Sequence, residues 1–146
     1  MKVSNKFMSI VTAAGLAATA LASGSAFAYT DQVMDPATSH DTAVKVRQVN
    51  YTCQNNGKIS VKYGFNKQNL PTYAEAYLNG KTRFLPINLG RSDDVQTVFG
   101  DEENFSIMSD TLRLNNYHKS SVNIQNANSE FLYKGCDAKS IKKIKG

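Results

Sequence analysis

The chain has 146 residues, and its 17 Lys and Arg residues against 12 Asp and Glu residues give a formal net charge of +5 at pH 7. A chain of this length has room for one hydrophobic core rather than several. The basic excess is too mild to predict nucleic-acid binding, so no nucleic-acid partner is expected.

The first 28 residues have the pattern of a secretory signal peptide. Residues 1–6 carry two lysines and no acid, residues 7–21 are apolar and rich in Ala, and residues 26–28 (Ala-Phe-Ala) supply a cleavage site. The apolar run is shorter than the roughly 20 residues of a membrane-spanning helix, so no transmembrane segment is expected. Cleavage would lower the formal charge from +5 to +3, because two lysines and no acid are lost. We expect an exported protein.

The two cysteines, Cys53 and Cys136, are predicted to form one disulfide, the default for an exported protein with no third cysteine. The bond would close a loop of 82 intervening residues. Restricting the unfolded chain in this way stabilises the fold by at most about 4–5 kcal/mol. Two distant cysteines with only His40 and His118 make a poor zinc site, so no metal or other cofactor is expected.

The expected strands begin after a polar segment. Residues 29–43 contain one proline and no apolar periodicity, which predicts a flexible leader. Alternation of apolar and polar residues then predicts a first strand from Val44 to Cys53. Residues 58–65 form the clearest strand, and Gly64 inside it indicates a bend or a close backbone approach.

Residues 72–88 are predicted to form a hairpin around the Asn-Gly pair at positions 79 and 80. A two-residue turn would place Glu75 opposite Phe84, which mixes a charged and an aromatic residue on one face. A three-residue loop with the glycine left-handed would place Glu75 opposite Arg83 and separates polar from apolar residues better. We therefore expect the three-residue loop.

Shorter alternating runs complete the predicted β-structure. Eight or nine short strands with Gly and Asn turns, and no sustained helical period, predict an all-β antiparallel barrel or sandwich over residues 44–137. Four lysines and no acid in the last eight residues predict a basic, disordered tail over residues 138–146. The later strands are expected at residues 95–99, 104–108, 111–114, 122–124 and 130–136.

Residues 89–105, LGRSDDVQTVFGDEENF, reverse the basic character of the chain. Five of the twelve acids fall within eleven positions here. A local sign reversal is typical of a surface that attracts a basic partner, although a solvated loop is the commoner role of a charge run. The five acids are Asp93, Asp94, Asp101, Glu102 and Glu103.

No catalytic motif accompanies this acidic stretch. The sequence contains no G-x-S-x-G nucleophile motif, and its acids do not follow the D-x-D-x-D-G spacing of a calcium-binding loop. The chain also contains no Trp to stack on a sugar. We therefore expect a binding protein rather than an enzyme.

Several segments together resemble the adhesin complex protein family of Neisseria: VNYTC (49–53), VKYGFNKQ (61–68), LGRSDDVQTVFG (89–100) and FLYKGC (131–136). The chain is more distantly similar to the periplasmic and membrane-bound inhibitors of C-type lysozyme. The resemblance implies an eight-stranded antiparallel β-barrel closed by one disulfide. It also implies exposure in the periplasm or at the outer surface of a Gram-negative bacterium. Two activities follow from it, namely inhibition of host C-type lysozyme and adhesion to host cells.

In the inhibitor families a serine-containing loop enters the lysozyme cleft, and the resemblance implies that Ser92 takes this place. The chain departs from those inhibitors directly afterwards, where Asp93-Asp94-Val95 replaces a small, basic and aromatic run. We expect Ser92 and nearby backbone in the cleft, and the five acids of the stretch against basic residues at its rim. The predicted function is occlusion of the lysozyme cleft together with an adhesin role. The alternative is a surface adhesin without lysozyme inhibition.

Overall fold

The computed structural model describes residues 31–146, and the predicted signal peptide at residues 1–28 lies outside them. Within the described range, no helix has both the length and the hydropathy to span a bilayer. The described elements are two short helical segments, α2 (Pro36–Asp41) and η2 (Gln54–Asn56), and the strands β1 (Lys45–Thr52), β2 (Lys58–Phe65), β3 (Pro71–Leu78), β4 (Lys81–Pro86), β5 (Gln96–Gly100), β6 (Ser106–Asp110), β7 (Val122–Gln125) and β8 (Phe131–Lys145).

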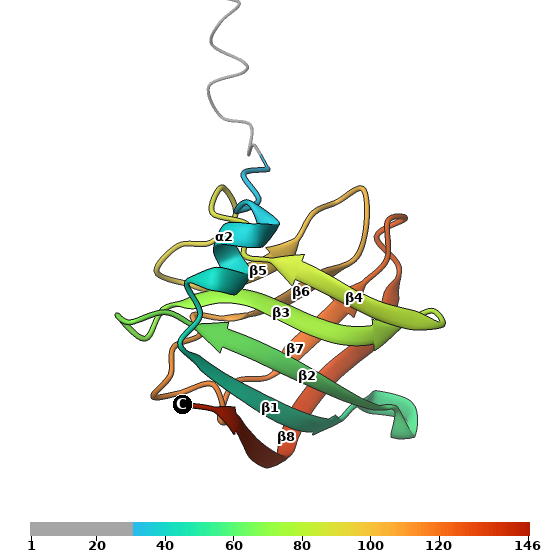
Figure 1. Cartoon of the computed structure of the whole chain (residues 1–146). Coiled ribbons are helices and arrows are strands. Elements are labelled where there is room, and N and C mark those ends of the chain that lie inside the picture. The colour runs from blue at the N-terminus through green and yellow to red at the C-terminus, as the bar shows by residue number, and fades with distance from the viewer. Residues whose placement is uncertain (1–30) are drawn as a thin grey trace, which may run out of the picture. The chain divides into compact units, whose positions relative to one another are not determined.

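The eight strands form one antiparallel sheet that curls into a nearly closed barrel (Figure 1). Their order is β4-β3-β2-β1-β8-β7-β6-β5, so the meanders β1–β4 and β5–β8 are joined by the pairing of β1 with β8. On the opposite side, the β4/β5 seam is held by a bridge between Ile87 and Phe99 and by the Asn88 N–H, which donates to the Val98 carbonyl at 2.8 Å. The predicted eight-stranded antiparallel barrel is confirmed.

The predicted disulfide is also confirmed, since Cys53 directly after β1 is bonded to Cys136 in β8.

The inner faces of both meanders form the hydrophobic core, with fully buried side chains such as Val49, Val61 and Phe99. Two tyrosines from neighbouring strands, Tyr51 and Tyr63, share a hydrogen bond between their hydroxyls at 2.7 Å inside this core. Burial raises the pKa of both hydroxyls, so the pair stays neutral.

A second apolar cluster lies on the outer surface of β3 and β4, beneath α2 (Figure 1). The rings of Tyr73 and Phe84 lie 4.6 Å apart, and the His40 ring of α2 stacks on Tyr73 at 6.2 Å. The helix begins where the Asp35 carboxylate accepts a hydrogen bond from the Thr38 N–H at 3.0 Å. The outer face of the barrel is therefore not uniformly polar.

The prediction of a flexible leader over residues 29–43 is wrong for the part that the structure describes. Residues 36–41 form α2, and Val33 makes a β-bridge to Asn88. The Met34 N–H also donates to the Ile87 carbonyl at 2.9 Å. These contacts have no signature in the local sequence, because their partners lie more than 50 positions further along the chain.

The hairpin register expected between β3 and β4 is also wrong. Leu78 pairs with Lys81, so the turn has two residues, and Glu75 faces Phe84. Asn79 and Gly80 both have positive φ, as a type I′ turn requires. The mixed face that argued against this register is tolerated because Phe84 packs on Tyr73 under α2.

The tail predicted as disordered is ordered, because β8 continues to Lys145 and pairs with β1 as far as Val46. The Arg47 guanidinium donates to the carbonyls of Lys145 at 2.8 Å and Gly146 at 3.0 Å. Strand pairing uses backbone groups, so exposed lysine side chains do not prevent it.

The strand expected at residues 111–114 is not formed; these residues make a bend and an irregular segment that lead into a turn at residues 114–119. The Asn116 side chain accepts from the Arg113 N–H at 2.7 Å and donates to the Thr111 carbonyl at 2.9 Å. An asparagine that satisfies nearby backbone groups in this way competes with strand pairing.

Replacement of Gly64 by Ala tests the close backbone approach that the sequence indicated. The Tyr73 ring lies directly over Gly64, and an added Cβ would also lie 2.9 Å from the Ala43 Cβ. We expect Gly64→Ala to lower the free energy of unfolding by about 1–3 kcal/mol, measured by urea denaturation. Gly57→Ala is the control, because its Cβ would lie 3.4 Å from Tyr133, an ordinary contact distance. Equal urea midpoints for the two variants would contradict the prediction.

Candidate functional site

The acidic stretch of residues 89–105 lies along the β4/β5 seam and is here called the acidic ridge; its exposed parts are the loop before β5 and the turn after it, because residues 97–100 of β5 are buried. The loop that leaves β4 turns at Leu89 and comes back beside β5, where the Asp93 N–H donates to the Gln96 carbonyl at 2.9 Å. The ridge then continues through β5 into the turn that leads to β6. It is therefore attached to both meanders.

Ser92 does not lie at the tip of the loop. Its hydroxyl accepts from the Val98 N–H at 2.9 Å and donates to the Val98 carbonyl at 3.3 Å, and the residue is half-buried. The tip is formed by Asp94 and Val95, and Val95 is 75% exposed. Ser92 fastens the loop to β5, and Asp94 and Val95 project into solvent.

Asp93 closes a tight turn with its own side chain. One carboxylate oxygen, Oδ1, accepts from the Val95 N–H at 2.8 Å and from the Gln96 N–H at 3.0 Å. These two hydrogen bonds favour the ionised form and lower the pKa of Asp93. Within residues 31–146, Asp94 takes part in no ion pair, so its charge is free to act on a partner.

The other three acids lie at the far end of β5. Asp101 Oδ1 accepts from the Glu103 N–H at 2.9 Å and from Asn104 Nδ2 at 3.0 Å. Glu102 is neutralised by Arg91, whose guanidinium lies 2.9 Å from its carboxylate. Because β5 has five residues, about 16 Å separates these acids from the pair at 93 and 94. The five predicted acids thus form two groups, not one cluster.

A shallow hollow of about 260 Å³ lies beside the Ser92 loop. Aliphatic side chains line much of it, and Leu70 and Leu89 are 41% and 53% exposed. Asp93, Asp94 and Arg113 also line it. Sequence reasoning missed Leu70 and Leu89, although each is an aliphatic residue next to a turn, outside any alternating run. Exposed aliphatic area bordered by charge is typical of a protein-binding surface.

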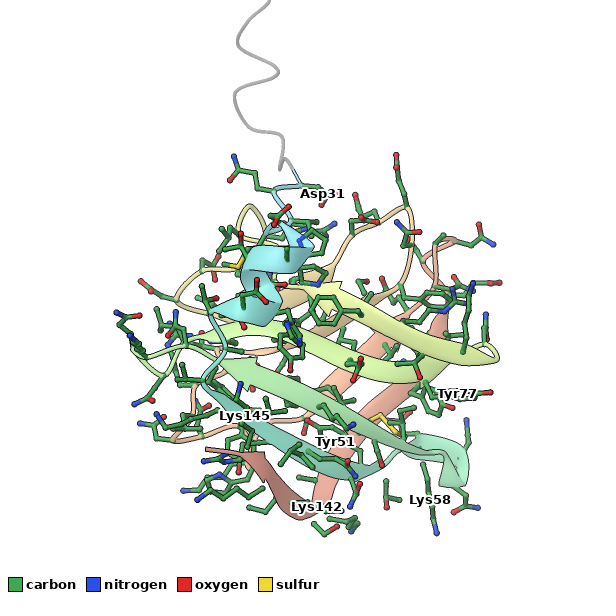
Figure 2. All side chains as sticks on the ribbon, viewed as in Figure 1. Asp31, Tyr51, Lys58, Tyr77, Lys142 and Lys145 are labelled. Carbon is green, nitrogen blue, oxygen red and sulfur yellow. A yellow bond between two sulfur atoms is a disulfide. The ribbon has the colours of Figure 1, made fainter. Side chains whose placement is uncertain are left out.

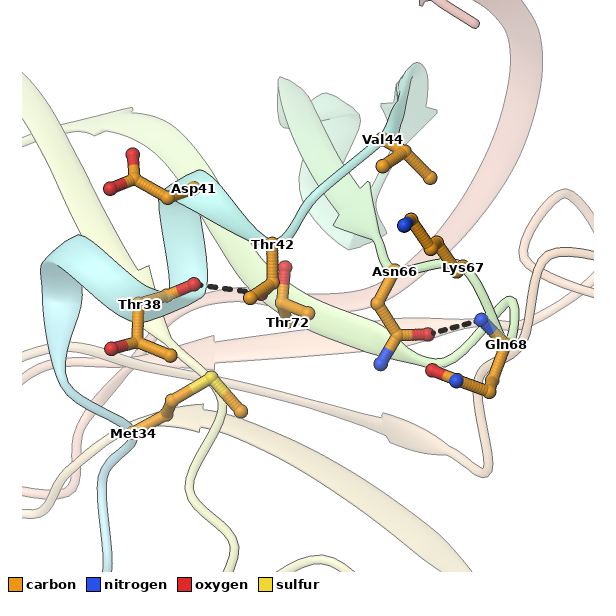
Figure 3. Close-up of a pocket in the computed structure, with 9 residues that line it drawn as sticks. All are labelled: Met34, Thr38, Asp41, Thr42, Val44, Asn66, Lys67, Gln68 and Thr72. Carbon is orange, nitrogen blue, oxygen red and sulfur yellow. Dashed lines mark hydrogen bonds between the residues drawn. The ribbon is translucent and has the colours of Figure 1, made fainter.

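A larger hollow of about 470 Å³ lies between α2 and the turn after β2 (Figure 3). Figure 3 shows hydrogen bonds inside each wall, from the Thr42 hydroxyl to the Thr38 carbonyl at 2.7 Å and from the Gln68 N–H to Asn66 Oδ1 at 2.9 Å. None of the predicted site residues lines it. In the described part of the chain, no group of His, Cys, Asp or Glu side chains is placed to hold a metal ion.

Comparison with known proteins finds similarity over most of the barrel. A family model described as "Nm-ACP: ACP-like domain" matches residues 47–138. The solved structure of the Adhesin Complex Protein from Neisseria meningitidis matches with 37% sequence identity and a TM-score of 0.60, covering 63% of this chain and 98% of that chain. No curated protein matches the chain. The family match includes the whole acidic ridge.

Asp93 is expected to stiffen the tip through its two backbone hydrogen bonds. Asp93→Ala should lower the hydrogen-exchange protection of the Val95 and Gln96 amides, whereas Asp93→Asn keeps an acceptor oxygen and most of the protection. Because its folded-state pKa is lowered, Asp93 stabilises the loop above its unfolded-state pKa. That stabilisation is lost as the pH falls through the folded-state value. Asp94→Ala is the control, and protection that is unchanged in Asp93→Ala would refute the assignment.

Proposed function

The chain belongs to the ACP-like domain family of the adhesin complex protein type, and on this basis we propose that it is an exported protein with an adhesin-like role whose acidic ridge binds a basic protein. Export would follow from the signal peptide proposed at residues 1–28, and the periplasm or outer surface of a Gram-negative bacterium would be its location. One similar protein of solved structure is named as the Adhesin Complex Protein from Neisseria meningitidis, which supports the adhesin-like role.

The proposed protein partner of the ridge is a C-type lysozyme, which would be inhibited by occlusion of its cleft without turnover. The observation that carries this proposal is the pairing of uncompensated carboxylates with exposed aliphatic side chains at the tip. Asp94 supplies the charge, while Val95 and Leu89 supply apolar contact area. Charge complementarity speeds encounter and orients the partners, and the aliphatic contacts hold them together.

The structure changes the role we propose for Ser92. Its hydroxyl is engaged by the backbone of Val98, so we assign it to positioning the tip rather than to contacting the cleft floor. Val95, which is exposed at the tip, becomes the proposed entering residue, and Asp93 and Asp94 would meet basic residues at the cleft rim. Asp101 and Glu103 would meet the cleft rim about 16 Å away, across the length of β5. Glu102 contributes less, because Arg91 already compensates it.

Inhibition of cell-wall lysis by purified lysozyme tests the proposal directly. We expect the protein to slow lysis at a few-fold molar excess. Asp94→Lys should weaken inhibition by at least about tenfold at low ionic strength and should reduce its salt dependence. Asp41→Lys is the matched control, because it makes the same charge change on α2, outside the ridge. Unchanged lysis with the wild-type protein would reject lysozyme as the partner. Equal losses in both variants would reject the ridge as the contact site.

The second candidate is an adhesin that binds host cells without inhibiting lysozyme. The lysine-rich strand β8 favours it, because cell surfaces are rich in anionic groups. Removal of residues 138–146 is not a clean test, since they pair with β1. Binding of the Asp94→Lys variant to host cells separates the two functions. This variant should bind cells like the wild type if adhesion uses another surface.

A further inference from the structure

The C-terminal half of β8 is a lysine-bearing strand with one free edge. Strand β7 pairs with β8 only as far as Cys136, whereas β1 pairs with it on the other side up to Lys145. Every residue from Lys139 to Lys145 is exposed. Four of these seven residues are lysines, and none is acidic.

Cations on the two neighbouring strands extend this surface. Strand register places Gln48 of β1 between Lys142 of β8 and Lys62 of β2, so these two lysines are about 10 Å apart across the sheet. Lys45 lies at the start of β1. Paired residues share a face of the sheet, so Lys62, Lys142 and Lys145 lie on one face, whereas Lys45, opposite Phe65, and Lys143, opposite Arg47, lie on the other. We call the whole lysine-bearing region along this edge the basic face; its residues are Lys45, Lys62, Lys139, Lys142, Lys143 and Lys145.

The positive charge of the basic face is largely uncompensated. In residues 31–146, the ion pairs involve His40 and Arg91, and none includes a lysine of this face. The acids beside it are Glu75, opposite Lys62 on β3, and Asp137, which accepts a hydrogen bond from Ser121 at 2.6 Å.

The two charged surfaces lie on opposite sides of the barrel. In the strand order, the β1/β8 junction is farthest from the β4/β5 seam that carries the acidic ridge. Figure 2 shows Lys142 and Lys145 on the side of β1 and β8, away from Asp31 at the other end. A polyanion can therefore approach the basic face without meeting the ridge.

We propose that the basic face binds a sulfated polysaccharide, which deepens the adhesin-like role proposed above and rests on it. The centre of the face is polar and fixed, because the Asn50 side chain donates to the Ser140 hydroxyl at 2.8 Å and accepts from the Ser60 hydroxyl at 2.6 Å. Lysines held on both sides of a fixed strand edge, around amide and hydroxyl groups, match the sulfates and hydroxyls of a polysaccharide that runs along the edge.

An anionic membrane matches this surface less well. Peripheral membrane binding combines basic charge with apolar or aromatic side chains that enter the lipid. Here Ile141 and Ile144 are half-exposed, and residues 137–146 contain no aromatic side chain. Lysines on an edge strand also prevent unwanted strand pairing, a role that needs no ligand. Both alternatives are outcomes of the test below.

The test measures binding to heparin oligosaccharides by isothermal titration calorimetry at increasing salt. We expect wild-type binding that weakens steeply between about 50 and 200 mM salt, and at least about a tenfold higher Kd for Lys139→Gln/Lys142→Gln/Lys143→Gln. Lys67→Gln/Lys81→Gln/Lys119→Gln is the matched control, with three exposed lysines changed elsewhere. It should keep most of the affinity.

Three results would overturn the proposal. Absence of heparin binding would leave edge protection as the role of the lysines, and equal losses in the two triple variants would indicate a general charge effect. Tighter binding to phosphatidylglycerol vesicles than to heparin would assign the face to membranes. A parallel assay on host cells separates this inference from its premise. If the protein does not bind heparin but still binds host cells after enzymatic removal of their sulfated glycans, the adhesin-like role stands and the polysaccharide is excluded as the ligand.

Discussion

The pairing of β1 with β8 is the contact on which the rest of the barrel depends. Each meander of four strands arises from local hairpins, and each has an apolar inner face that it cannot bury alone. Pairing of β1 with β8 sets the two inner faces against each other around Tyr63 and Phe99, whose rings lie 5.6 Å apart. The Cys53–Cys136 bond favours this long-range pairing by restricting the unfolded chain.

Joining two meanders creates two seams, and the charged surfaces follow them. The chain must cross from β4 to β5 to begin the second meander, and this crossing carries the acidic ridge. The other seam places the lysines of β8 beside those of β1 and β2. A basic protein and a polyanion can thus approach from opposite sides. The barrel keeps the two charge groups from neutralising each other.

Within the ridge, some side chains hold the loops in place through hydrogen bonds to the backbone, and others project into solvent. Ser92, Asp93 and Asp101 use their oxygens on nearby backbone N–H groups. Asp94 and Val95 project from the loop that these bonds hold. A tip that is already ordered loses little conformational entropy on binding, which favours affinity.

The sequence by itself determined the antiparallel β class, the disulfide and the position of the acidic stretch, because alternation, cysteine count and charge are readable from neighbouring residues. It also indicated the close approach at Gly64, which proved to be the Tyr73 ring. Only the tertiary structure decided the β3–β4 register, because Phe84 gains its apolar partner from Tyr73 and a helix in the leader. The same holds for the ordered C-terminal strand, which requires β1, and for the acids, which β5 separates into two groups. Each of these outcomes depends on a partner distant in the sequence or on the rigid length of a strand, and a local pattern contains neither.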